Sequence, residues 1–103
     1  MKKKTINVIT IRGGKARHET IKNDLATMQK IVGGYIETYT VGRTVVICDE
    51  EGRLKGKAPT LVFGDQTFVG DLIICGISGS DFTDVPRYMK VGVTEVENDA
   101  VTE

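Results

Sequence analysis

Only one segment of this chain spaces its apolar residues as a helix does. Ile21, Leu25, Met28 and Val32 follow one another at intervals of four, three and four, which places them on one helical stripe. The remaining apolar residues lie in short β-branched or alternating runs separated by glycine turns, the pattern of strands. We therefore predict an α+β fold: a mostly antiparallel sheet with one packed helix over residues 24–32.

Local signals mark the ends of these elements. Asn23 is the expected N-cap of the helix, and Gly33 is expected to end it in the left-handed conformation. Gly42-Arg43 separates the strands 35–41 and 44–49, and glycine at the first turn position predicts a type II′ hairpin.

The other segments are predicted with the same rules. Strands are expected at 5–11, 16–21, 61–63, 67–69, 72–77 and 91–96. Residues 54–60 read as irregular because Pro59 bars a central strand. Asp81 or Thr83 is expected to cap a short helical turn before 86–89. Residues 1–96 should form a single domain, followed by an acidic tail at 97–103.

The charges balance overall but not locally. Fourteen basic and fourteen acidic side chains give no net charge, which argues against a partner such as bulk nucleic acid. Residues 1–30 carry eight basic and two acidic side chains, whereas residues 61–103 carry two basic and eight acidic ones. The two ends could pair or simply face solvent. Alternatively, Arg12, Lys15 and Arg17 form a basic patch for the phosphates of a small ligand.

Cysteine placement indicates the cellular setting. Cys48 and Cys75 both lie in apolar strand segments, so we expect buried free thiols and no disulfide. No apolar run reaches the length of a signal-peptide core or a membrane-spanning helix. These observations predict a cytoplasmic protein without a membrane partner.

The residues that catalysis requires are scarce. His18 is the only histidine, so a Ser/His or Cys/His pair has one possible base, in a charged and solvent-facing stretch. One histidine and two strand cysteines do not make a zinc site, and residues 52–58 are one residue too short for a phosphate-binding P-loop. We expect no enzyme activity, no metal and no cofactor.

Two sets of residues are candidates for ligand binding. Tyr35, Glu37 and Tyr39 share one face of a strand and could hold a base or ribose, although ordinary cross-strand packing explains them too. Glycines in turns would let a ligand approach the backbone, or serve as plain connections. These glycines are Gly33, Gly34, Gly76 and Gly79.

An ordered set of short motifs resembles one known family. The motifs are Asn23-Asp24-Leu25, Met28-Gln29, residues 31–37 (IVGGYIE), residues 48–52 (CDEEG), Pro59, Gly76 and Asp81-Phe82. Together they resemble the phage and mobile-element proteins catalogued as domain of unknown function 3846, over roughly residues 5–90. Where that family commonly has Pro-Asn, this chain has Pro59-Thr60.

The resemblance implies a setting rather than an activity. The chain is similar in size, and in its lack of catalytic residues, to small phage proteins that sequester nucleotide immune signals. The expectation is a homo-oligomer that captures a cyclic nucleotide or a cyclic ADP-ribose type of signal in the infected or carrying bacterial cell. The alternative is a protein–protein interaction module that inhibits or adapts a host enzyme through an edge strand and the acidic tail.

Overall fold

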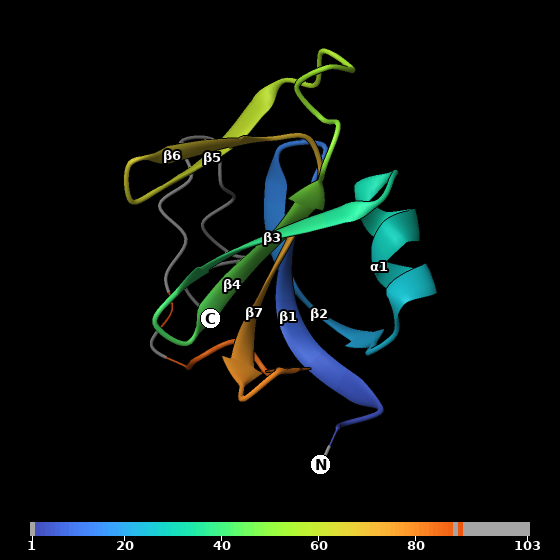
Figure 1. The fold of residues 1–103 in the computed structure, drawn as a ribbon, viewed down its shortest axis with the longest axis vertical. Helices are drawn as coiled ribbons and strands as arrows, with labels where there is room; N and C mark the ends of the chain where they lie inside the picture. The colour runs from blue at the N-terminus through green and yellow to red at the C-terminus, as the bar shows by residue number, and fades with distance from the viewer. Residues whose placement is uncertain (1, 88, 90–103) are drawn as a thin grey trace.

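The computed structural model describes residues 2–87 and 89, which form one helix and eight strands (Figure 1). In chain order the elements are β1 (Thr5–Arg12), β2 (Lys15–Lys22), α1 (Leu25–Val32), β3 (Ile36–Val41), β4 (Thr44–Asp49), β5 (Pro59–Phe63), β6 (Gln66–Val69), β7 (Leu72–Ser78) and β8 (Asp81–Thr83). No helix of these residues has the length and apolarity needed to cross a membrane.

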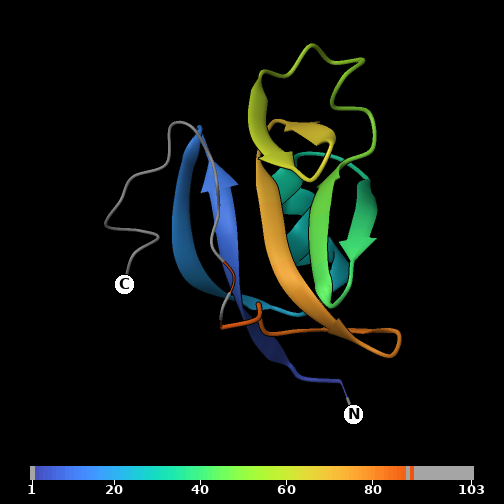
Figure 2. The ribbon, with the colours of Figure 1, turned by 90° about the vertical axis from the view of Figure 1, so that its left-hand side faces the viewer.

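The main sheet has the order β2-β1-β7-β4-β3, and β8 pairs with the end of β7. Every strand pair in it is antiparallel. The predicted α+β fold with a single helix is therefore confirmed. β7 lies at the centre because its side chains Leu72 to Cys75 are all buried, as its continuous apolar run requires. Among the described strands, β2 and β3 form the two edges (Figure 2).

Both faces of this sheet are covered. Alternate residues of the strands pack on α1, and we call this side the helix face; its centre includes Val8, Ile47 and Ile73. The opposite side, the hairpin face, includes Ile9, Val46 and Ile74 and packs against the separate two-stranded sheet of β5 and β6. Figure 1 shows α1 on one side of the strands and the β5–β6 hairpin across one end of the sheet.

The helix differs in detail from its prediction. Asp24, rather than Asn23, is the N-cap: its carboxylate accepts a hydrogen bond from the Thr27 N–H at 2.8 Å. The Asn23 side chain is instead buried and donates to the Lys3 carbonyl at 2.9 Å. Gly33 ends the helix at φ +83°, as predicted. Leu25 belongs to the predicted apolar stripe but is 55% exposed, because it lies in the first turn, beyond the sheet.

Two other local predictions were wrong. Pro59 does not lie in an irregular segment; it is the first residue of β5, a position where a strand tolerates proline because its missing N–H is not needed. The segment after Gly79-Ser80 forms β8 rather than a helical turn, because these two residues reverse the chain and Asp81 pairs with Ser78. The predicted strand at 91–96 and the acidic tail at 97–103 lie outside the described residues.

Candidate functional site

The best-connected polar group among the described residues is the carboxylate of Asp49. Its side chain is 1% exposed and accepts hydrogen bonds from Lys55 Nζ at 2.7 Å and from the Glu51 N–H at 2.9 Å. Lys57 Nζ lies 2.8 Å from the same carboxylate oxygen as Lys55. This group of Asp49, Lys55 and Lys57 is called the lysine cluster below.

The lysine cluster also holds the end of the helix. Lys57 donates to the Val32 carbonyl at 2.8 Å and Lys55 to the Gly33 carbonyl at 3.0 Å. Carbonyls at a helix C-terminus lack intrahelical partners and carry partial negative charge, so two ammonium groups satisfy them well. Burial alone would raise the pKa of Asp49, but the bonds from both lysines outweigh it and hold that pKa well below its usual range.

Gly34 passes next to this cluster with no room for a side chain. A Cβ at this position would lie 2.6 Å from Asp49 Oδ1 and 2.8 Å from Lys55 Nζ. The two motifs IVGGYIE and CDEEG therefore meet where Gly34, just after the helix, packs against the buried carboxylate of Asp49. This packing role differs from the ligand approach that the sequence predicted for Gly33 and Gly34.

Replacing Gly34 with alanine is expected to destabilise the fold by about 1–3 kcal/mol, the usual cost of an overpacked site. The added methyl would have to displace Asp49 or Lys55, both of which hold the helix end. Chemical denaturation of the purified variant measures the effect. An unchanged unfolding midpoint would contradict this account of Gly34.

The basic residues of the predicted phosphate patch share one face. In the register of β1 and β2, Arg12 pairs with Lys15 and Thr10 with Arg17, which places all three cations on the helix face of the hairpin. Arg12 is not free, because it donates to both carboxylate oxygens of Glu19, at 2.9 and 3.1 Å. This ion pair raises the pKa of Arg12 and lowers the pKa of Glu19.

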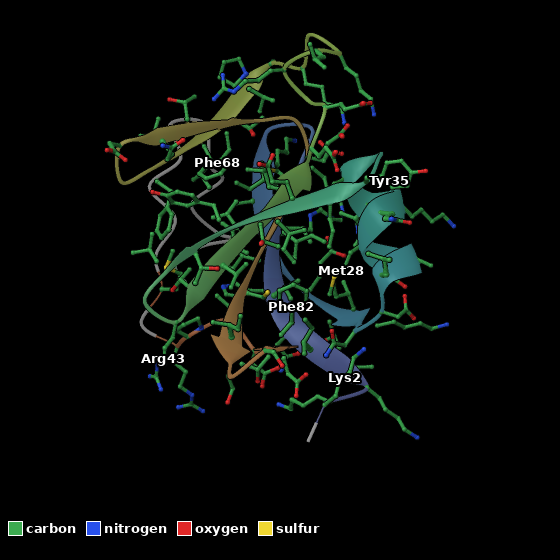
Figure 3. The ribbon with its side chains drawn as sticks, viewed as in Figure 1. Lys2, Met28, Tyr35, Arg43, Phe68 and Phe82 are labelled. Carbon is green, nitrogen blue, oxygen red and sulfur yellow. The ribbon has the colours of Figure 1, made fainter. Side chains whose placement is uncertain are left out.

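The predicted aromatic set is divided. Glu37 and Tyr39 share the hairpin face, and Tyr39 packs edge-on against Phe68, with ring centroids 5.4 Å apart. Tyr35 precedes β3, is 71% exposed and lies beside α1, away from Phe68 (Figure 3). The ring of Tyr39 therefore packs in the hydrophobic core. A cavity of about 250 Å³ lies beside it, and Glu37 and Arg53 are among the residues that line this cavity.

Gly76 and Gly79 line a cavity with a volume of about 750 Å³. Its walls come from the β3–β4 turn, the end of β7 and the segment after β8, and they include Arg43, Thr83 and Arg87. A Cβ on Gly76 would clash with the Asp84 carbonyl, so this glycine lets the segment after β8 lie close to β7. We call this space the arginine cavity.

The electrostatic environment of the arginine cavity is positive. None of the ion pairs among the described residues includes Arg43 or Arg87. The Asp84 carboxylate also lines the cavity, but it accepts hydrogen bonds from the Asn7 N–H at 2.8 Å and from Lys3 Nζ at 2.6 Å. These bonds lower the pKa of Asp84 and engage its charge. Within residues 2–87 and 89, the guanidinium groups of Arg43 and Arg87 are the charges of the lining that make no ion pair.

A further cavity, of about 590 Å³, lies between the β1–β2 turn and the end of α1 and is lined by Gly13, Gly14, Lys30, Gly33 and Lys57. It suits an anion less well, because the C-terminus of a helix repels negative charge. Lys57 is also already bound to Val32 and Asp49. Gly33 thus lies at a cavity beside the β1–β2 turn, whereas Gly76 and Gly79 line the arginine cavity, so the predicted binding residues do not form one site.

Both thiols are free, as predicted, but only Cys75 is buried and Cys48 is half-buried. Burial raises the pKa of Cys48 and raises that of Cys75 to about 12, so neither is a reactive thiolate at neutral pH. Among the described residues there is no group of three or more potential metal ligands from His, Cys, Asp and Glu.

Sequence reasoning missed Arg43, Arg87 and both lysines of the cluster. The sequence pattern predicts a hairpin turn at Arg43 and an irregular segment at Lys55 and Lys57. A lone arginine in a turn carries no spacing signal. The acidic run 49–51 just before Lys55 and Lys57 is the signal for the lysine cluster, because the turns at 50–56 bring the chain back on itself.

Comparison with known proteins supports one assignment. No curated protein matches this chain, and no solved structure matches it. The sequence model of the family described as "Domain of unknown function (DUF3846)" matches residues 6–97, which is most of the chain. Two of the motifs that carry the resemblance, IVGGYIE and CDEEG, meet at the lysine cluster. The chain belongs to the DUF3846 family.

Proposed function

We propose that this protein is a non-enzymatic, phage or mobile-element binding protein that sequesters a small nucleotide-derived immune signal in the arginine cavity. The observation that carries the proposal is the pair of guanidinium groups, Arg43 and Arg87, at one hollow of about 750 Å³. Small-molecule sites commonly have volumes of about 300–1,000 Å³. Guanidinium groups bind phosphate through two parallel hydrogen bonds, which fits a phosphorylated ligand.

The rest of the lining supports the same class of ligand. Gly42 and Gly79 have open space where a side chain would stand, so a ligand can approach their backbone groups. Ser78 and Thr83 add hydroxyl groups that donate to or accept from a ribose or phosphate. The cavity therefore offers both charge and directional hydrogen bonds without a nucleophile–base pair.

Removing either guanidinium should weaken binding. A charge-assisted hydrogen bond contributes about 1.5–3 kcal/mol, so Arg43→Gln and Arg87→Gln should each raise the dissociation constant by about ten- to a hundredfold. Calorimetric titration of the wild-type protein with cyclic dinucleotides and cyclic ADP-ribose isomers comes first. The variants are then titrated with the compound that binds.

Arg17→Gln is the matched control, because it removes the same charge from the exposed face of β2. Arg17→Gln should leave the affinity within about twofold of wild type. If Arg17→Gln abolishes binding while Arg43→Gln does not, the ligand binds at the β1–β2 face. If no compound of the panel binds, the proposed function is wrong.

Heat denaturation distinguishes sequestration from degradation. A sequestering protein releases its ligand intact, so mass spectrometry of the supernatant should recover the added compound unchanged. Loss of the compound would show an enzyme instead. A stoichiometric host protein captured from lysate, with no small molecule bound, would favour the alternative of a protein–protein interaction module.

A further inference from the structure

The two edges of the main sheet differ in charge. β2 carries Lys15, Arg17, His18, Glu19 and Lys22, and such charges protect an edge strand against pairing with another chain. β3 has the sequence IETYTV, with Glu37 as its only charged residue. Among the described residues no strand pairs with the outer side of β3, and Figure 2 shows it as the outermost strand.

The β3–β4 turn determines which backbone groups of β3 point outward. Val41 pairs with Thr44 across a two-residue loop in which Gly42 has φ +61° and Arg43 does not have positive φ, which is the predicted type II′ turn. The residues that close such a loop exchange hydrogen bonds. Val41, Tyr39 and Glu37 therefore bond to β4, whereas alternate residues present their N–H and C=O groups to the outside. These residues are Ile36, Thr38 and Thr40.

We propose that two copies of this chain pair antiparallel through β3, with Thr38 at the two-fold axis. In this register Thr38 faces the Thr38 of the second copy, and Ile36 faces its Thr40. All three outward-facing residues then gain hydrogen-bond partners within the strand. The sheets of the two copies become one continuous sheet.

Charge complementarity selects this register. In an antiparallel pair the side chains stay on their own face of the sheet only if even-numbered residues pair with even-numbered ones and odd with odd. The nearest alternative registers are therefore shifted by two residues. Displacement one way places Glu37 against the second copy's Glu37, two like charges directly opposite each other. Displacement the other way pairs Ile36 with the turn residue Gly42 and loses ladder bonds. The register centred on Thr38 places Glu37 beside the second copy's Tyr39 and avoids both penalties.

An exposed apolar residue of β3 fits the same arrangement. Val41, at the turn end of the strand, is 48% exposed. In the register centred on Thr38 it lies beside the start of the second copy's β3. Pairing therefore covers an apolar side chain that the single chain leaves in water.

A proline at the axis tests the interface. Wild-type protein should show twice the 11.3 kDa chain mass in light scattering and in sedimentation equilibrium at high concentration. Thr38→Pro removes an outward N–H and should reduce the mass to that of one chain, with the far-UV circular dichroism unchanged. His18→Pro is the matched control on the other edge strand. A two-residue turn also closes the β1–β2 hairpin, so by the same rule the His18 N–H points away from β1. His18→Pro should remain a dimer.

Cross-linking tests the register without relying on the proline variant. Opposed hydrogen-bonded residues have Cα atoms about 5.5 Å apart, within disulfide range. Under mild oxidation, Thr38→Cys should form a covalent dimer. Thr40→Cys should not, because it lies about 13 Å along the strand from its counterpart. The native thiols should contribute little, since burial raises the pKa of both.

Three results would overturn the proposal. They are a wild-type protein that is monomeric at every concentration, a dimer that Thr38→Pro does not dissociate, and cross-linking of Thr40→Cys as efficient as that of Thr38→Cys. The proposal does not depend on the proposed function, because none of these measurements involves a ligand. If the dimer proposal fails, the proposed function is still tested by ligand titration, and the reverse also holds.

Discussion

Replacing Asp49 with alanine is expected to lower the free energy of unfolding by about 3–5 kcal/mol, as the removal of one partner from a buried ion pair usually does. The Asp49 side chain is 1% exposed and is the shared acceptor of Lys55 and Lys57. Without it, the half-buried ammonium of Lys57 keeps only the Val32 carbonyl as a partner. The loop 50–57 also loses the carboxylate that positions both lysines and accepts the Glu51 N–H. Urea denaturation followed by circular dichroism measures the loss.

Asp65→Ala is the matched control for this prediction. Asp65 lies in the exposed β5–β6 turn, so removing its carboxylate should change the free energy of unfolding by less than about 0.5 kcal/mol. If the two variants lose equal stability, the lysine cluster does not hold the fold together.

Acid provides a second readout of the same carboxylate. The pKa of Asp49 is depressed in the folded protein, so its contribution to stability is fully present above the unfolded pKa of about 3.9. The contribution is lost as pH falls below that value towards the folded pKa. Wild-type protein should therefore lose stability steeply below about pH 4. Asp49→Ala should lose less over the same range, because it has no such carboxylate to protonate.

Much of the fold could be predicted because each element carries its own local signal. The period of two in β1, the apolar run of β7 and the glycine of the β3–β4 turn depend only on neighbouring residues. The errors occur where a distant partner decides the outcome. Asparagine is a residue type that helix N-caps favour, but the side chain of Asn23 instead donates to the Lys3 and Phe82 carbonyls. Aspartate is another such type, but pairing with β7 draws Asp81 into β8.

The candidate site was less predictable, because the chain assembles it from segments far apart in sequence. Arg43 and Arg87 become neighbours of one cavity only through the pairing of β4, β7 and β8. Gly34 looks like a flexible turn residue until Asp49 and Lys55 are seen to occupy the space of its missing side chain. Thr60 has a polar role that its place in the sequence does not reveal: its hydroxyl donates to the Gly70 carbonyl at 2.7 Å.

Replacing Phe68 with alanine is expected to cost about 3–5 kcal/mol, the range for a buried phenylalanine. Phe68 is 8% exposed, and its ring packs at 62° to that of Tyr39 on the edge strand β3. Since β5 and β6 form a separate two-stranded sheet, side chains rather than ladder hydrogen bonds hold them to the main sheet. An isolated hairpin is only marginally stable in water, so the loss should concentrate in β5 and β6.

Amide hydrogen exchange locates that loss. In Phe68→Ala the amides of β5 and β6 should exchange much faster than in wild type. Those of β4 and β7 should remain nearly as well protected from exchange as in wild type. Phe63→Ala is the control: Phe63 is half-buried, with its ring centroid 6.5 Å from that of Tyr39, and should lose about half as much stability. Uniform loss of protection in Phe68→Ala would mean that the two sheets unfold as one cooperative unit. β5 and β6 do not line the arginine cavity. Under the proposed function, the affinity for the ligand should therefore survive if the hairpin opens alone, and be lost if both sheets unfold together.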